Sequence, residues 1–169
     1  MGREIAHLRK LAFAPPDDSI FLDTTYLEIE RDCIVRARVL WDCALVEEFM
    51  ALIIMNQILS DSPKWNEIKY FGRIKRYHIF YAHILGRVPA RYKMSIVRKF
   101  IRLPKSITKT VERMLALRDI LAHVCTLDYT RKKDFSYKGQ SIFSETGFES
   151  YMHDSTDAIA FLVKQTKLI

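Results

Sequence analysis

The sequence predicts an all-α fold with a long central helix. Glycine and proline number only five each among 169 residues, too few turn formers for a fold of many short strands. Hydrophobic residues make up 49% of the chain and charged residues 28%, which is ordinary for a globular protein. Apolar residues also recur at spacings of three and four, as they do along one face of a helix.

The long central helix is expected from about Thr24 to Leu59. Neither glycine nor proline interrupts this stretch, and a threonine at its start can serve as the N-cap. The run Phe49–Met55 is almost wholly apolar, so we expect other elements to surround it on most sides. Residues 1–23 precede the helix as a short arm that a pair of prolines interrupts.

Three further helical segments are expected after a break at residues 60–63. The first covers about 64–85 and ends before Gly86, and the second covers about 89–103 and ends at Pro104. The third begins at Ser106 or Thr108 and continues through the apolar positions up to residue 121.

The C-terminal part of the chain changes character. Residues 129–148 are polar and aromatic and contain Gly139 and Gly147, which predicts a hairpin or loop with lysine at its tip. The polar run Asp154–Asp157 is typical of an N-cap and predicts a last helix over residues 158–167. The length of the chain suits a single domain, which we expect to cover residues 24–169.

Positive charge is concentrated in one stretch. Between Lys64 and Arg113 there are fourteen Lys or Arg and two Glu, a balance of +12, whereas the whole chain carries only +7. Such a stretch can attract a nucleic acid, an anionic membrane or an acidic protein. The alternative, which charge alone leaves equally open, is a solvated helix face.

The cysteines and the apolar runs bear on location. Cys33 and Cys43 fall in the helical pattern and are expected to be reduced core residues of a cytoplasmic protein. The start of the chain is too charged for a signal peptide. The most apolar stretch, Val39–Leu59, contains three acidic residues, so we expect it to lie inside a bundle and not in a membrane.

The segment Arg118–His123 carries the residues best suited to chemistry. On an ideal helix Arg118 and His123 point about 140° apart, so both line a wide groove, or two chains bring them together across a two-fold axis. Asp119 lies four residues before His123, on the same helical face, where a carboxylate can orient the imidazole and raise its basicity.

These side chains suit the cleavage of RNA by transesterification. A histidine can take the proton from a ribose 2′-hydroxyl or return one to the 5′-oxygen, and an arginine can stabilise charge on the phosphate. Neither a metal nor another cofactor is expected, because no cluster of residues has the spacing of metal ligands. One histidine per chain is too few for both proton transfers, so we expect a homodimer with Arg118, Asp119 and His123 as catalytic residues.

The run from Leu117 to His123 resembles the R-x4-6-H signature of the HEPN superfamily (higher eukaryotes and prokaryotes nucleotide-binding). Asp119 stands where that signature has a polar residue after the arginine, and Ala122 stands where it commonly has a small one. Glu47 and Glu48 match the paired acids of an earlier apolar helix in that family. The resemblance covers about residues 24–127 and is nearest to the branch of mannitol-operon repressor proteins and related bacterial domains, where a segment similar to 71–85 lies between the two helices.

The resemblance implies an up-and-down bundle of four to five helices that forms a homodimer, in which Arg118 and His123 of both chains line a shared cleft. Many relatives in this superfamily are toxin or defence ribonucleases, so the first hypothesis is a metal-independent endoribonuclease, with an antitoxin or another protein as a further partner. The basic residues expected to bind RNA are Lys69, Arg73, Lys75, Arg76, Arg98, Lys99 and Arg102. Aromatic residues that can stack on bases, or else belong to the core, are Tyr70, Phe71, Tyr77, Phe80, Tyr81 and Tyr92.

The second hypothesis is a regulatory dimer without catalytic activity that binds a protein or a nucleotide. Arg118 and Asp119 then form a structural ion pair, and His123 lies at an interface. A DNA-binding repressor is a weaker variant, because no helix-turn-helix spacing stands out in the sequence.

Overall fold

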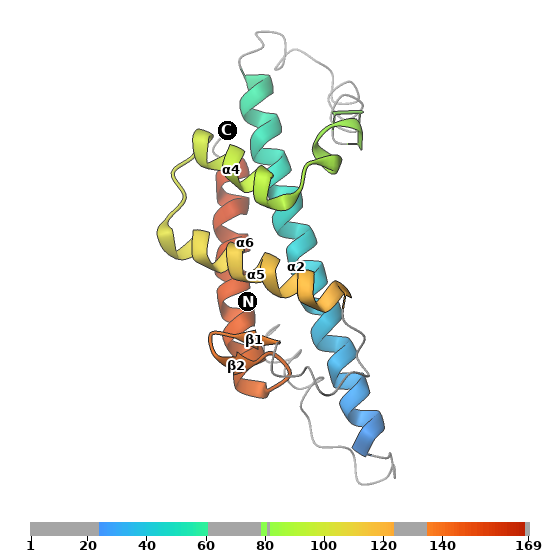
Figure 1. The fold of residues 1–169 in the computed structure, drawn as a ribbon. Helices are drawn as coiled ribbons and strands as arrows, with labels where there is room; N and C mark the ends of the chain where they lie inside the picture. The colour runs from blue at the N-terminus through green and yellow to red at the C-terminus, as the bar shows by residue number, and fades with distance from the viewer. Residues whose placement is uncertain (1–23, 61–78, 81, 124–134, 168–169) are drawn as a thin grey trace. The chain divides into compact units, whose positions relative to one another are not determined.

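The computed structural model describes residues 24–60, 79–80, 82–123 and 135–167. These residues form an all-α helical bundle with one short hairpin, which confirms the predicted fold class (Figure 1). The N-terminal arm and most of the helix expected over 64–85 lie outside the described residues. In chain order the elements are α2 (Thr24–Ser60), the 3-10 turn η1 (Leu85–Arg87), α4 (Ala90–Phe100), α5 (Lys105–His123), β1 (Ser136–Tyr137), β2 (Gln140–Ser141) and α6 (Glu145–Lys167).

Two compact units divide the chain between them. The first unit comprises Met1–Cys43 and Arg113–Asp157, and the second comprises Ala44–Glu112 and Ala158–Ile169. Each unit has its own buried apolar side chains, for example Val39 and Leu115 in the first and Ile54 and Val97 in the second. The expectation that residues 24–169 form a single domain stays a prediction.

Helix α2 matches the long helix expected from the sequence. It continues for 37 residues without interruption, because neither glycine nor proline occurs in it (Figure 1). In the first unit Val35 and Val39 are fully buried at the spacing of a helical face. In the second unit Met50 and the four residues Ala51, Ile53, Ile54 and Met55 are at most 2% exposed, which confirms that the apolar run is enclosed on most sides.

No described helix is both long enough and apolar enough to span a membrane.

The prediction for the two cysteines of α2 is half right. Cys43 is buried, and its thiol donates to the carbonyl of Met114 at 3.4 Å, as expected for a small core residue. Cys33 is exposed, so the expectation that it belongs to the core is wrong.

Helices α4 and α5 begin where prolines favour a helix start. Pro89 precedes α4, and the helix ends at Phe100 because Ile101 adopts an extended conformation. Pro104 precedes α5, and its carbonyl accepts a hydrogen bond from the N–H of Thr108 at 3.0 Å. Helix α5 therefore begins at Lys105, slightly before the predicted start.

The hairpin predicted for the lysine- and glycine-containing segment is present as β1 and β2. Tyr137 pairs with Gln140, which leaves Lys138 and Gly139 as a two-residue turn. Both turn residues have positive φ, 51° for Lys138 and 82° for Gly139, as a type I′ turn requires. Lysine stands at the tip, as the sequence predicted.

Helix α6 begins at Glu145 and not at residue 158 as predicted. Ser144 is its N-cap: the serine Oγ accepts a hydrogen bond from the N–H of Gly147 at 3.1 Å. The polar residues that had suggested a later cap bind other elements of the first unit. Asp154 accepts from the hydroxyl of Tyr137, and Ser155 donates to Asp42. Their polarity therefore reflects tertiary contacts in the middle of a helix.

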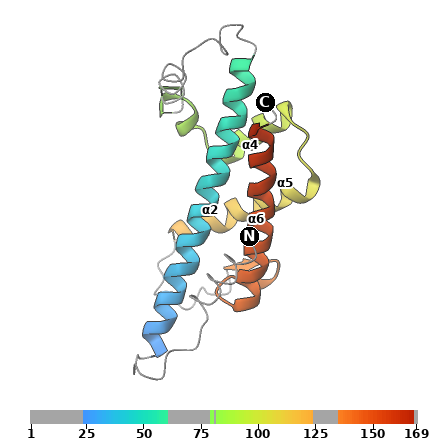
Figure 2. The ribbon, with the colours of Figure 1, turned by 180° about the vertical axis from the view of Figure 1, so that it is seen from behind.

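Gly147 brings the first turn of α6 against strand β2, and both figures show the hairpin beside that end of the helix (Figures 1 and 2). A Cβ atom at Gly147 would overlap the carbonyl oxygen of Ser141 and lie 2.8 Å from its carbon. Because backbone atoms cannot move aside as a flexible side chain can, Gly147→Ala is expected to lower the free energy of unfolding by about 1–3 kcal/mol. Chemical denaturation measures the change.

The matched control for that substitution is Thr146→Ala, an exposed position on the same turn. Its effect is expected to stay within about 0.5 kcal/mol, as for most surface substitutions. Equal effects of the two substitutions would contradict the argument from close approach.

Candidate functional site

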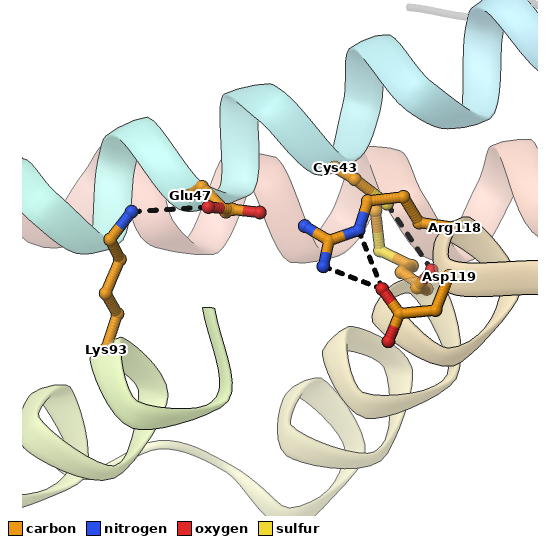
Figure 3. A network of polar contacts seen from close by, with 6 residues as sticks. Cys43, Glu47, Lys93, Arg118 and Asp119 are labelled. Atoms are coloured by element: carbon orange, nitrogen blue, oxygen red, sulfur yellow. Dashed lines mark hydrogen bonds and ion pairs between the residues drawn. The ribbon is translucent and has the colours of Figure 1, made fainter. Parts of the chain in front are cut away.

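The motif residues lie at the C-terminal end of α5, within the first unit. Arg118 donates from Nε and Nη2 to the same oxygen of Asp119, Oδ1, at 3.1 and 2.8 Å (Figure 3). The two side chains are 28% and 45% exposed, so solvent still reaches the pair. The guanidinium is therefore held by its sequence neighbour and remains partly open to solvent.

His123 is the last residue of α5, and its side chain lies outside the described residues. The helix is continuous from Arg118 to His123, so the backbone positions of the two residues are about 140° apart around the axis of an ideal helix. This is the arrangement on which the prediction of a wide or two-chain site depends. The expected orientation of His123 by Asp119 stays a prediction.

Sequence reasoning missed a contact from α2 to the motif. Arg36 donates from Nη1 to the carbonyl oxygen of Leu121 at 2.9 Å, and its guanidinium lies 5.7 Å from the centre of the Phe135 ring. Carbonyls in the last turn of a helix lack partners within the helix, and a cation there also suits the helix dipole. Arg36 therefore stabilises the last turn of α5, which carries His123.

The first unit also contains a buried polar cluster. Asp42 is 0% exposed, its Oδ1 is 2.9 Å from Nε of Arg38, and its Oδ2 accepts from the hydroxyl of Ser155 at 2.9 Å. Burial raises the pKa of Asp42, and it outweighs the opposing effects of Arg38, Ser155 and Tyr151. Burial and the nearby Asp42 also raise the pKa of the Tyr151 hydroxyl well above its usual value.

The acidic residue of this cluster is Asp42, which in the sequence served only as evidence against a membrane span. Asp42, Ser155 and Tyr151 are enclosed by protein, so we assign the cluster to the stability of the first unit and not to contact with a ligand. The sign of this cluster in the sequence was a polar residue, Asp42, within an apolar helical run. Its partner Ser155 is 113 positions away, and spacing could not identify it.

The second unit contains the described part of the basic stretch, except for Arg113. Arg98, Lys99 and Arg102 are exposed, as RNA-binding residues need to be. Arg98 also forms an ion pair of 2.7 Å with Glu112. The other predicted RNA-binding residues lie outside the described residues: Lys69, Arg73, Lys75 and Arg76.

One cation of the basic stretch is turned inward. Lys93 is 1% exposed, and its Nζ lies 3.2 Å from Oε2 of Glu47, which comes from α2 (Figure 3). The net charge of the stretch thus overstates the charge available to a ligand. It also gives Glu47, one of the two acids in the family resemblance, a structural partner.

Among the described residues, no group of three or more His, Cys, Asp or Glu side chains is placed to hold a metal ion. Comparison of the chain with family models, with curated proteins and with solved structures found no match.

Proposed function

We propose that the protein is a metal-independent endoribonuclease with its active site at the interface of a homodimer. The observation that carries the proposal is the conformation of the motif: Arg118 and His123 lie on one unbroken helix, with the guanidinium fixed by Asp119. Because the two residues diverge around the helix, two copies of the chain offer a shared cleft that one copy does not.

The proposed reaction divides the work between two histidines. His123 of one copy takes the proton of the ribose 2′-hydroxyl, and the 2′-oxygen attacks the adjacent phosphorus. The bond from phosphorus to the 5′-oxygen breaks, and the partner's His123 gives that oxygen a proton. The products are a 2′,3′-cyclic phosphate and a 5′-hydroxyl.

The role of Arg118 in this reaction is electrostatic. A guanidinium is always charged and planar, and it matches the phosphate oxygens, on which charge develops as the 2′-oxygen attacks. Asp119 positions this group by accepting two of its N–H donors, which lowers the entropy lost when the phosphate binds. A basic surface on the second unit would supply general affinity for RNA.

The Arg118–Asp119 ion pair also supports a second candidate, a non-catalytic regulatory dimer that binds a protein or a nucleotide. In that role the pair is only structural, and its partial exposure makes it worth little to stability. The substitution Arg118→Lys separates the two candidates, because only the ribonuclease has a cleavage rate that it can lower.

The proposal is tested by incubating the purified protein with RNA of mixed sequence in EDTA and analysing the product ends. We expect cleavage with cyclic phosphate ends, and we expect Arg118→Lys to cleave about 10²-fold more slowly, because lysine keeps the charge but lacks the forked donors. Arg113→Lys, an exposed position on the same helix, is the matched control and should keep full activity.

Absence of cleavage by the wild-type protein would overturn the ribonuclease and favour the regulatory dimer. Cleavage at the same rate by Arg118→Lys and by the control would remove Arg118 from the active site.

A further inference from the structure

The outward face of α4 combines an exposed aromatic ring with cations. The inward face consists of Ala90, Lys93, Met94 and Val97, spaced by three, one and three residues and at most 4% exposed. Tyr92 is 68% exposed on the other side. Of the six aromatic residues that the sequence offered as stacking platforms, only Phe80 and Tyr92 are described, and Phe80 is partly covered.

Tyr92 shares its face with a lysine and a serine. Lys99 follows two helical turns later, so it lies on nearly the same side of α4 at a rise of about 10 Å. Ser95 stands between them and is exposed, and Arg91 borders the same face and is also exposed. The tyrosine ring is thus accessible from solvent with cations along the helix beside it.

The charge of this region is strongly one-sided. Residues 85–112 contain eight Lys or Arg and a single acidic residue, Glu112. Lys93 is buried against Glu47, but Lys99 and Arg102 are exposed. The ion pair of Arg98 with Glu112 is about half exposed on both sides, and such pairs contribute so little that a phosphate can replace the carboxylate.

We infer that the outward face of α4 binds single-stranded RNA, with one base stacked on Tyr92 and the backbone phosphates on Lys99 and Arg91. An exposed ring beside cations fits a nucleobase next to its phosphates, because every base has a π-face and every linkage has a negative charge. A duplex offers no unpaired base face along its length, so the site selects single strands. The inference rests on the proposed function in taking RNA as the ligand.

Binding is tested by fluorescence anisotropy with a short labelled RNA of mixed sequence, in the full-length His123→Ala protein so that the RNA is not cut. Tyr92→Ala is expected to weaken binding of the single strand by about 5- to 150-fold. Tyr92→Phe keeps the ring and should bind as the parent does. The same RNA annealed to its complement should bind more weakly and should not respond to Tyr92→Ala.

A second substitution tests the phosphate contacts. Lys99→Gln should lower the slope of log affinity against log salt concentration by about one. Lys164→Gln, an exposed lysine on α6, is the matched control and should leave both the affinity and the slope unchanged. Thermal unfolding of each variant shows that the fold is kept.

Equal RNA binding by Tyr92→Ala and its parent would overturn the inference. The absence of any RNA binding would also overturn it and would favour an acidic protein as the partner of these cations. Binding that depends on Tyr92 in a protein that never cleaves RNA would support the inference and would contradict only the ribonuclease. The two failures are therefore distinguishable.

Discussion

Replacing His123 by alanine is expected to slow RNA cleavage by about 10²- to 10⁴-fold, the usual contribution of general acid and base catalysis. The loss should be large because a symmetric dimer loses both of its histidines in one substitution. His123 ends α5, so the substitution leaves the buried face of that helix intact, including Leu115 and Leu117. The rate is measured as the appearance of cyclic phosphate ends from RNA in EDTA.

The matched control is His83→Ala, an exposed histidine in the second unit, which should cleave at the wild-type rate. If one histidine acts as base and the other as acid, the wild-type rate follows a bell-shaped pH profile. Equal cleavage by His123→Ala and His83→Ala would exclude His123 from the reaction. Loss of cleavage together with loss of the folded state would show a structural role for this histidine.

Asp42→Ala is expected to lower the free energy of unfolding by about 1–3 kcal/mol, the usual cost of leaving buried hydrogen-bonding groups without their partner. The substitution leaves Nε of Arg38 facing the interior and takes the acceptor from the buried hydroxyl of Ser155. Chemical denaturation measures the change. Asp157→Ala, whose carboxylate is 59% exposed, is the control and should change stability by less than about 0.5 kcal/mol.

The pH dependence of the same position follows from its ionisation. Burial raises the pKa of Asp42 in the folded protein, so folding favours its protonated form. The resulting stability is fully present below the unfolded value, near pH 4, and is lost as the pH rises through the folded pKa. Asp42→Asn keeps an acceptor but cannot ionise, so the wild-type protein should lose stability relative to this variant as the pH rises.

The pKa of Asp154 is shifted in the opposite direction. Because wild type and Asp42→Asn both contain Asp154, its effect on stability cancels when the two proteins are compared. Burial opposes its ionisation, yet the hydrogen bonds from Lys138 and Tyr137 prevail and lower its pKa. Its contribution is present above the unfolded value and is lost as the pH falls. A constant difference between wild type and Asp42→Asn across the acid range would contradict the raised pKa of Asp42.

The local sequence pattern predicted those helices and turns that depend mainly on residues close together in the chain. The absence of helix breakers predicted α2, and a glycine after a lysine predicted the tip of the hairpin. The start of α6 was missed because Asp154 and Ser155 look like cap residues in the sequence. In the fold they bind Tyr137, Lys138 and Asp42, and nothing in their local spacing indicates this.

In the candidate site, too, local features were predictable from the sequence and tertiary contacts were not. Residue spacing placed Arg118 and Asp119 together on a helix and offered their ion pair as one of two readings. The contact of Arg36 with the carbonyl of Leu121 joins residues 85 positions apart, so only the folded structure reveals it. Likewise, composition counted Lys93 among the cations of the basic stretch, and its burial against Glu47 depends on how α4 packs on α2 within the second unit.

The hairpin and the first turns of α6 have a consequence for the order in which the chain folds. Tyr137 reaches Asp154 across 17 positions, and Ser141 reaches Ser144 across only three. Closing such short loops costs little entropy, whereas the bond from Ser155 to Asp42 spans 113 positions. Short-range contacts of this kind form quickly. The corner made by the hairpin and the capped start of α6 can therefore fold first, with Ser155 already on a helix before Asp42 arrives to accept its hydrogen bond.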